Sequence, residues 1–256
     1  MKAFLFVIPV IILLPVIYVF AAFCRSLIYT WKRPAGKLYE MRRAEGNFCE
    51  YNRLPHKIID YVLAMEDNAF FSHKGYDANA IKRAFKKNLQ QKKIVMGGST
   101  ITQQLAKNLY YRFDRRLFRK LSEFFTALHI EKHLDKTEIL ELYLNVIYYG
   151  HGIYGLYDAA HFYFNKDYQD LDVAQAFCLI CILPSPAKIN PLTDQRSYII
   201  MREKKIKQVL WIGDEMHYVS LIREKIDCSH LLQSDNHNYS NHDIKINEKY
   251  NRKVFC

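Results

Sequence analysis

Two stretches decide the fold: residues 66–77 read EDNAFFSHKGYD, and residues 97–108 read GGSTITQQLAKN. The first brings carboxylates, an imidazole, aromatic rings and a glycine close together, and the second follows a glycine pair with hydroxyl, amide and lysine side chains. An amphipathic helix needs only one polar face and does not require this mixture at these spacings. We therefore expect a polar cleft for a charged, hydroxyl-rich substrate.

Apolar residues around these stretches recur at helical spacing. The predicted stripes are Ile58, Ile59, Val62 and Met65; Ile101, Leu105 and Leu109; Leu117, Leu121, Phe124, Phe125 and Leu128; and Ile139, Leu142, Tyr143 and Val146. Glu66 falls near the end of the first helix, and Glu123 lies off the third stripe. Gln103 and Lys107 are expected together on one exposed side of the second helix. Because no alternating run of similar strength predicts strands, the soluble part is expected to be mainly α.

Capping signals support these helices. Ser99 or Thr100 is a candidate N-cap of the second helix, and residues 135–138 resemble a capping box that opens the fourth. Glycines then interrupt the pattern before a last apolar run at residues 171–183, which prolines end. That run contains Cys178 and Cys181, which we interpret as small core residues rather than a redox or metal pair, since the six cysteines match no disulfide or zinc spacing.

The N-terminus contains an uncharged stretch from Ala3 to Cys24. At about 1.5 Å per residue it spans roughly the 30 Å of a bilayer core, which predicts a transmembrane helix. Pro9 and Pro15 are tolerated in a helix that lies in lipid. A cleaved signal peptide is the alternative, but the apolar run is too long for one. A lipoprotein built on Cys24 is disfavoured because the bulky Phe23 precedes it.

The net charge of +11 indicates an acidic partner: nucleic acid, an anionic membrane or a phosphorylated substrate. With a membrane anchor, nucleic acid is disfavoured. A basic cluster between the two stretches either faces lipid phosphates or is an ordinary solvated helix face: Lys82, Arg83, Lys86, Lys87, Lys92 and Lys93. More basic residues follow the anchor than precede it, yet long domains translocate largely regardless of this bias, so it does not fix the orientation.

Two glutamates are candidates for catalysis. Sugar transfer needs a carboxylate that takes a proton from the attacking hydroxyl, and cations that stabilise the leaving group. Glu66 is the better candidate for the base, although a simple pairing with His73 or Lys74 would also explain it. Glu123 follows Arg119 and Lys120 by one helical turn, a spacing that an ordinary surface ion pair explains equally well.

Residues 54–191 resemble the glycosyltransferase family 51 domain, the peptidoglycan transglycosylases that occur alone or fused to penicillin-binding transpeptidases. The resemblance rests on five ordered motifs. They are Glu66, Asp67, Phe70, His73, Gly75 and Asp77; residues 97–108; Arg119, Lys120 and Glu123; residues 139–145; and residues 150–152 with 163–166. Two positions depart from the family pattern: Gln175 stands where Glu is common, and Asn165 replaces a usual Gly.

The resemblance implies a role for each matching residue. Glu66 would be the base acting on the acceptor sugar's 4-hydroxyl, and Glu123 a second carboxylate that assists the donor side. Lys107 and Arg115 would hold the donor diphosphate. The other implied substrate-binding residues are Asp67, His73, Ser99, Thr100, Gln103, Gln104, Asn108 and Arg119. No cofactor is required; Asp67 could bind a divalent cation, but no ligand cluster demands one.

The resemblance also implies a mainly α, lysozyme-like domain with a small membrane-proximal lobe, on the outer side of a bacterial cytoplasmic membrane. The expected bounds are an anchor at 1–25, a linker or jaw at 26–53, the transglycosylase domain at 54–196, and an extension at 197–256 that frays after about 233. A monofunctional enzyme is expected, with a lipid-linked peptidoglycan precursor, the membrane and other cell-wall synthesis proteins as partners. A lysozyme-like hydrolase and a non-catalytic cell-wall scaffold are the alternatives.

Overall fold

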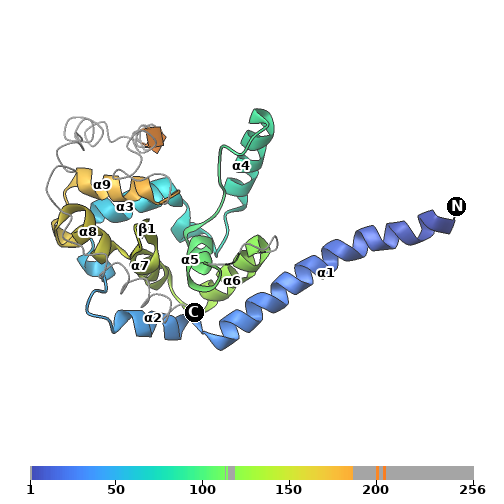
Figure 1. Cartoon of the computed structure of the whole chain (residues 1–256), viewed down its shortest axis with the longest axis horizontal. Helices are drawn as coiled ribbons and strands as arrows, with labels where there is room; N and C mark the ends of the chain where they lie inside the picture. The colour runs from blue at the N-terminus through green and yellow to red at the C-terminus, as the bar shows by residue number, and fades with distance from the viewer. Residues whose placement is uncertain (1, 113, 115–118, 187–199, 202–203, 206–256) are drawn as a thin grey trace. The chain divides into compact units, whose positions relative to one another are not determined.

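The computed structural model describes residues 2–112, 114, 119–186, 200–201 and 204–205, with the backbone alone for residues 2–12. The described chain is mainly helical, as predicted (Figure 1). Contacts divide it into two compact units. Unit 1 comprises Met1–Met41 and His73–Ile139, and unit 2 comprises Arg42–Ser72 and Leu140–Cys256. Each unit is therefore built from separate stretches of sequence, and the domain bounds expected from the sequence stay a prediction.

Unit 1 is a group of helices: α1 (Lys2–Lys32), most of α2 (Ala35–Arg43), α4 (Ala78–Gln91), α5 (Ile101–Tyr110) and α6 (Arg119–His133). Helix α6 packs against both α1 and α5. The predicted stripe of α5 is confirmed, because Ile101, Leu105 and Leu109 are buried. Helix α7 (Lys136–Val146) begins in this unit and continues into unit 2. The predicted box at its start is confirmed, since the backbone and side chains of Asp135 and Glu138 bond each other reciprocally.

Helix α1 is longer than the predicted anchor and is continuous from Lys2 to Lys32 (Figure 1). By length and composition, Leu13–Lys32 could cross a membrane, yet Ala22, Ser26 and Thr30 are buried against protein. Residues 13–14, 16–20 and 23 leave large apolar side chains exposed. The helix thus runs without a break from an exposed apolar segment into a segment that packs against α6.

An ion pair fixes the second part of α1. Arg25 pairs with Asp114, and both side chains are about nine-tenths buried, at 10% and 9% exposure. The Arg25 guanidinium also lies 5.3 Å from the ring centre of Tyr29 and 5.1 Å from that of Tyr111. Burial is the main cause that raises the pKa of Tyr111 to about 12. This charged and aromatic cluster joins α1 to the end of α5.

The buried face of α6 differs from the predicted one. The large apolar residues Leu121, Phe124, Phe125 and Leu128 are only half-buried, and Leu117 lies outside the described residues. The buried residues are instead Ser122, Glu123, Thr126, Ala127 and Ile130. Small side chains on this face allow close packing, and the hydroxyl of Thr126 shares a 2.7 Å hydrogen bond with that of Tyr111. The expectation that Glu123 lies off the buried face was therefore wrong.

Helix α4 is amphipathic but leaves its apolar side uncovered. Asp77 caps it by accepting hydrogen bonds from the backbone N–H groups of Asn79 and Ala80, which gives that motif residue a structural role. Its large apolar side chains, Ile81, Phe85 and Leu89, are exposed. Their spacing of four residues places them on one stripe.

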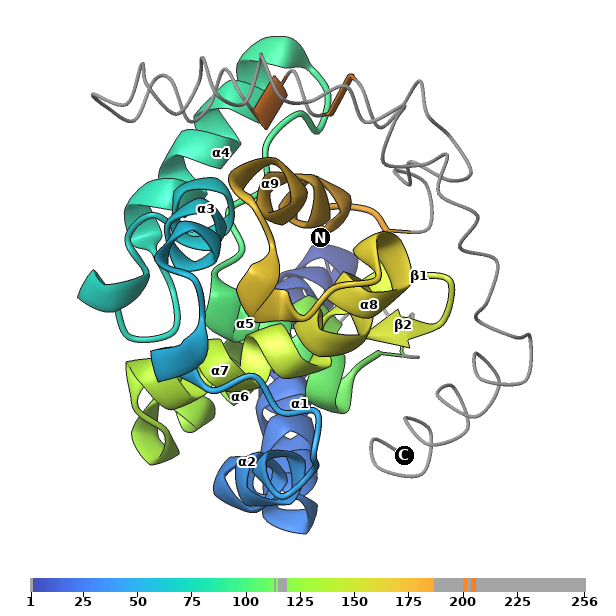
Figure 2. The same ribbon diagram turned by 90° about the vertical axis from the view of Figure 1, so that its left-hand side faces the viewer.

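Unit 2 combines 3₁₀ turns η1 (Tyr51–Arg53), η2 (Phe70–Ser72) and η3 (Tyr168–Asp170), helices α3 (His56–Glu66), α8 (Leu156–Phe164) and α9 (Val173–Ile182), and a two-stranded antiparallel hairpin of β1 (Tyr148–Gly150) and β2 (Ile153–Tyr154). Helix α3 lies beside α9 (Figure 2). The predicted α3 stripe is confirmed as buried, and Cys178 and Cys181 are buried free cysteines of α9.

After the hairpin, Gly155 has φ +86°, and a Cβ there would lie 2.7 Å from the backbone oxygen of Asn145.

The two departures from the family pattern have structural explanations. Asn165 ends α8 in the left-handed conformation, with φ 50°, and asparagine is the residue that tolerates this position best after glycine. Gln175 forms a capping box with Asp172 at the start of α9, where a glutamine amide serves as well as a glutamate.

Candidate active site

Glu66 is the last residue of α3, where the chain leaves the helix. Its side chain is only 10% exposed and pairs with Lys205, whose Nζ lies 2.8 Å from Glu66 Oε1. The same ammonium donates a 3.0 Å hydrogen bond to the backbone oxygen of Met65. The best candidate base is therefore a nearly buried carboxylate with a nearly buried cation beside it.

Two further polar groups of unit 2 lie near Glu66. Asp67 follows it directly, is 8% exposed, and is the C-cap residue of α3. Tyr143 of α7 is fully buried, and burial, followed by the negative charges of Glu66 and Asp67 among others, raises the pKa of its phenol well above its usual value. Tyr143 thus stays a neutral group at any physiological pH.

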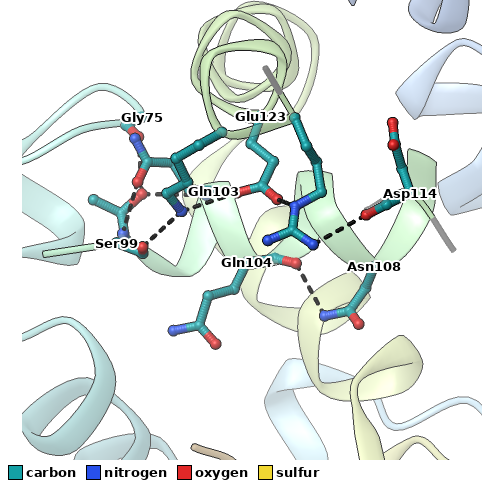
Figure 3. A network of polar contacts seen from close by, with 10 residues as sticks. Gly75, Ser99, Gln103, Gln104, Asn108, Asp114 and Glu123 are labelled. Carbon is teal, nitrogen blue, oxygen red and sulfur yellow. Dashed lines mark hydrogen bonds and ion pairs between the residues drawn. The ribbon is translucent and has the colours of Figure 1, made fainter. Parts of the chain in front are cut away.

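Glu123 is the centre of a charged cluster in unit 1 (Figure 3). Its side chain is 1% exposed and carries a cation on each oxygen: Arg119 Nε is 2.9 Å from Oε1, and Lys120 Nζ is 2.9 Å from Oε2. Lys120 also donates to the hydroxyl of Ser99 at 2.7 Å, and Arg119 donates to the backbone oxygen of Asp114 at 3.0 Å. The carboxylate lies beneath cations whose side chains are 37% and 56% exposed.

The second motif is largely a helix cap. Thr100 is the N-cap of α5 and forms a capping box with Gln103, and its hydroxyl donates to the Gly75 backbone oxygen at 2.8 Å. Gln103 is only 4% exposed, so its expected place on an exposed side was wrong; its amide reaches back to the Thr100 N–H. Asn108 is also buried, and its amide donates to the backbone oxygen of Gln104. Helix formation accounts for these contacts, and substrate binding by these residues stays a prediction.

The remaining predicted residues are placed as follows. Lys107 lies on the exposed side of α5, as expected, and Gln104 and His73 are half-buried. Arg115 lies outside the described residues. Ser99 and Arg119 meet at Glu123 through the contacts above, whereas Glu66 and Asp67 belong to the other unit. Among the described residues, no three or more His, Cys, Asp or Glu side chains are grouped to hold a metal ion.

Lys205 is the site residue that sequence reasoning missed. It contacts Glu66, which lies 139 positions earlier in the sequence. Neither hydrophobic periodicity nor local motif spacing can indicate a contact between residues so far apart. It also falls in the segment expected to be an extension outside the domain. The sequence did indicate a pairing of Lys120 with Glu123, but the spacing of these two residues is equally typical of an ordinary surface ion pair.

Comparison with known proteins assigns the family. The family model described as "Transglycosylase" matches residues 33–211. The chain belongs to the transglycosylase family. It is 34% identical over 197 residues to a biosynthetic peptidoglycan transglycosylase of Nitrosospira multiformis, covering 72% of this chain and 84% of the relative. The match reaches residue 211, so Lys205 lies within the family region.

Longer relatives share only part of their length with this chain. It is 40% identical over 141 residues to penicillin-binding protein 1F of Bacillus subtilis, covering 55% of this chain but 20% of the relative. Against penicillin-binding protein 1A of Aquifex aeolicus the identity is 38% over 197 residues, covering 73% and 27%. The transglycosylase thus spans about a fifth to a quarter of these penicillin-binding proteins.

Proposed function

We propose that this transglycosylase is a peptidoglycan glycosyltransferase that polymerises a lipid-linked disaccharide-peptide precursor into glycan strands. An acceptor hydroxyl attacks the anomeric carbon of the donor and forms the new glycosidic bond with inversion. The bond from that carbon to the diphosphate oxygen breaks, and the polyprenyl diphosphate leaves with the electron pair. The reaction needs one group to accept the hydroxyl proton and others to stabilise the diphosphate.

The Glu123 cluster is the observation that carries the proposal. Two cations and one carboxylate leave one net positive charge, and the cations, not the carboxylate, are the exposed members. Such a cluster favours an anion with several oxygens, for which arginine supplies a planar fork and lysine a point charge. Glu123 acts by orienting Arg119 and Lys120 toward the diphosphate, and Lys107 and Arg115 add further positive charge.

Glu66 is assigned as the base that takes the acceptor proton. It lies at a helix end, nearly buried, with its charge compensated by Lys205. A lysozyme-like hydrolase would also use carboxylates on either side of a glycosidic bond, but it expels an uncharged sugar and has no use for an anion-binding cluster. The exposed cations therefore favour transfer from a diphosphate donor. The predicted roles of Asp67, His73, Ser99 and Gln104 in holding substrate belong to the same proposal.

The enzyme is proposed to work at the outer face of a bacterial cytoplasmic membrane, anchored by α1. The exposed apolar segment of α1 supports an anchor. The outer face follows from the proposed reaction, since the polymer is built outside the cytoplasm. Other cell-wall synthesis proteins are proposed as its partners there.

Incubation of the purified full-length chain with labelled lipid-linked precursor in detergent tests the proposal, with products separated by size. Polymer is the expected product; released short sugars without polymer would indicate the hydrolase, and no turnover the scaffold. In the Glu66→Gln variant, polymerisation should fall by about 10²-fold or more, the usual effect of losing a general base. Asp60→Asn, an exposed carboxylate on the same helix, is the matched control and should retain the parent rate.

A further inference from the structure

One feature of unit 2 that the proposed reaction does not require is a buried lysine. Lys205 is 6% exposed, and lysine is almost never buried unless it is paired. Lysine also loses about 2 kcal/mol of side-chain rotamer entropy when it is fixed. A cation held in this way must be compensated by specific contacts, and the structure shows which contacts these are.

The contacts of Lys205 converge on the end of α3. Its ammonium donates to Glu66 Oε1 at 2.8 Å and to the Met65 backbone oxygen at 3.0 Å. Met65 carries one of the last carbonyls of α3, at the negative end of the helix dipole. A cation at a helix C-terminus interacts favourably with those carbonyls and with the helix dipole. One ammonium therefore bonds both the backbone that carries Glu66 and the carboxylate itself.

From this geometry we propose that Lys205 is a positioning residue for Glu66. By bonding the Met65 carbonyl and Glu66 Oε1 together, Lys205 restricts the rotation of the glutamate side chain relative to the helix end. The carboxylate is then oriented before the acceptor hydroxyl arrives, which lowers the entropic cost of the reactive geometry. Lys205 acts through Glu66 and transfers no proton itself. This inference rests on the proposed role of Glu66 as base.

Arginine and methionine substitutions separate positioning from simple packing. Lys205→Met keeps the length of the side chain but removes the donor, and it should lower kcat for polymerisation by about 10- to 100-fold, the loss expected for one charge-assisted hydrogen bond. KM for the precursor should change less than about twofold, because the contact orients a base and binds no substrate. Lys205→Arg retains a cationic donor and should recover part of kcat. Lys204→Met, an exposed neighbour in the same segment, is the control and should match the parent.

A double substitution makes the test independent of folding. If Lys205 acts through Glu66, then Glu66→Gln with Lys205→Met should be no slower than Glu66→Gln alone, because the base that Lys205 orients is already absent. A purely structural lysine would lower the rate of the Glu66→Gln enzyme again and by the same factor. That result, or a Lys205→Met enzyme with the parent kcat, overturns the inference. A parent enzyme that forms no polymer would instead overturn the proposed function, so the two failures are distinguishable.

Discussion

Substitution of Arg25 should show whether the N-terminal helix is a structural part of unit 1. Arg25 and Asp114 are about nine-tenths buried, and removal of one partner of a buried pair costs about 3–5 kcal/mol because the other charge is left unpaired. Arg25→Met also loses the stacking on Tyr29 and Tyr111, about 0.5–2 kcal/mol per contact. Because these terms overlap, we expect Arg25→Met to lower the free energy of unfolding of unit 1 by about 3 kcal/mol or more.

Hydrogen exchange of the full-length protein in detergent measures the loss of stability at individual helices. Helix α1 packs on α6, so the α6 amides should exchange faster in Arg25→Met, by about 10²-fold for 3 kcal/mol. Lys32→Met, an exposed residue of the same helix, should change the free energy of unfolding by less than about 0.5 kcal/mol. An Arg25→Met, Asp114→Leu double variant should regain most of the loss, because an apolar pair leaves no buried charge. Equal exchange in Arg25→Met and Lys32→Met, or simple additivity in the double variant, would refute the reasoning.

Three further predictions concern single residues. Lys107→Ala should lower kcat/KM for the precursor with little change in Tm, because its side chain lies on the exposed side of α5; unchanged kinetics would remove it from the site. Thr100→Ala removes the capping box of α5 and the hydrogen bond to Gly75, and should lower the free energy of unfolding by about 1 kcal/mol, measured by urea titration; no loss would show that the cap is dispensable. Asn165→Gly should raise Tm slightly or leave it unchanged, because glycine adopts φ 50° without steric cost, whereas Asn165→Val should lower it; the reverse order would contradict the assigned conformation.

The sequence predicted best what neighbouring residues determine. The stripes of α3 and α5 and the box that opens α7 depend on spacing within a few residues, and all three are confirmed. The N-cap at Thr100 was also among the predicted alternatives. For α5 and α7 the hydrophobic period and a side chain–backbone hydrogen bond favour the same structure, whereas α3 rests on the hydrophobic period alone.

Reasoning from local spacing was wrong, or found nothing, at three residues. Glu123 was expected off the buried face of α6 because periodicity ranks large apolar side chains as core. That face is instead lined by small and polar residues, since α6 packs closely against both α1 and α5. Gln103 was misplaced because a capping box turns a glutamine inward. Lys205 could not be found from spacing, because its partner is distant in sequence.

The unbroken course of α1 also governs how the enzyme meets its substrate. From Leu13 onward, the first buried residue of α1 is Ala22, and the preceding helical residues 2–21, at about 1.5 Å each, match the roughly 30 Å of a bilayer core. In the proposed anchorage no flexible linker separates the lipid-embedded part of α1 from the part that packs against α6. The enzyme is therefore held at a fixed distance from the membrane surface. Donor molecules must instead arrive by sideways diffusion within the same leaflet, and the encounter becomes a two-dimensional one.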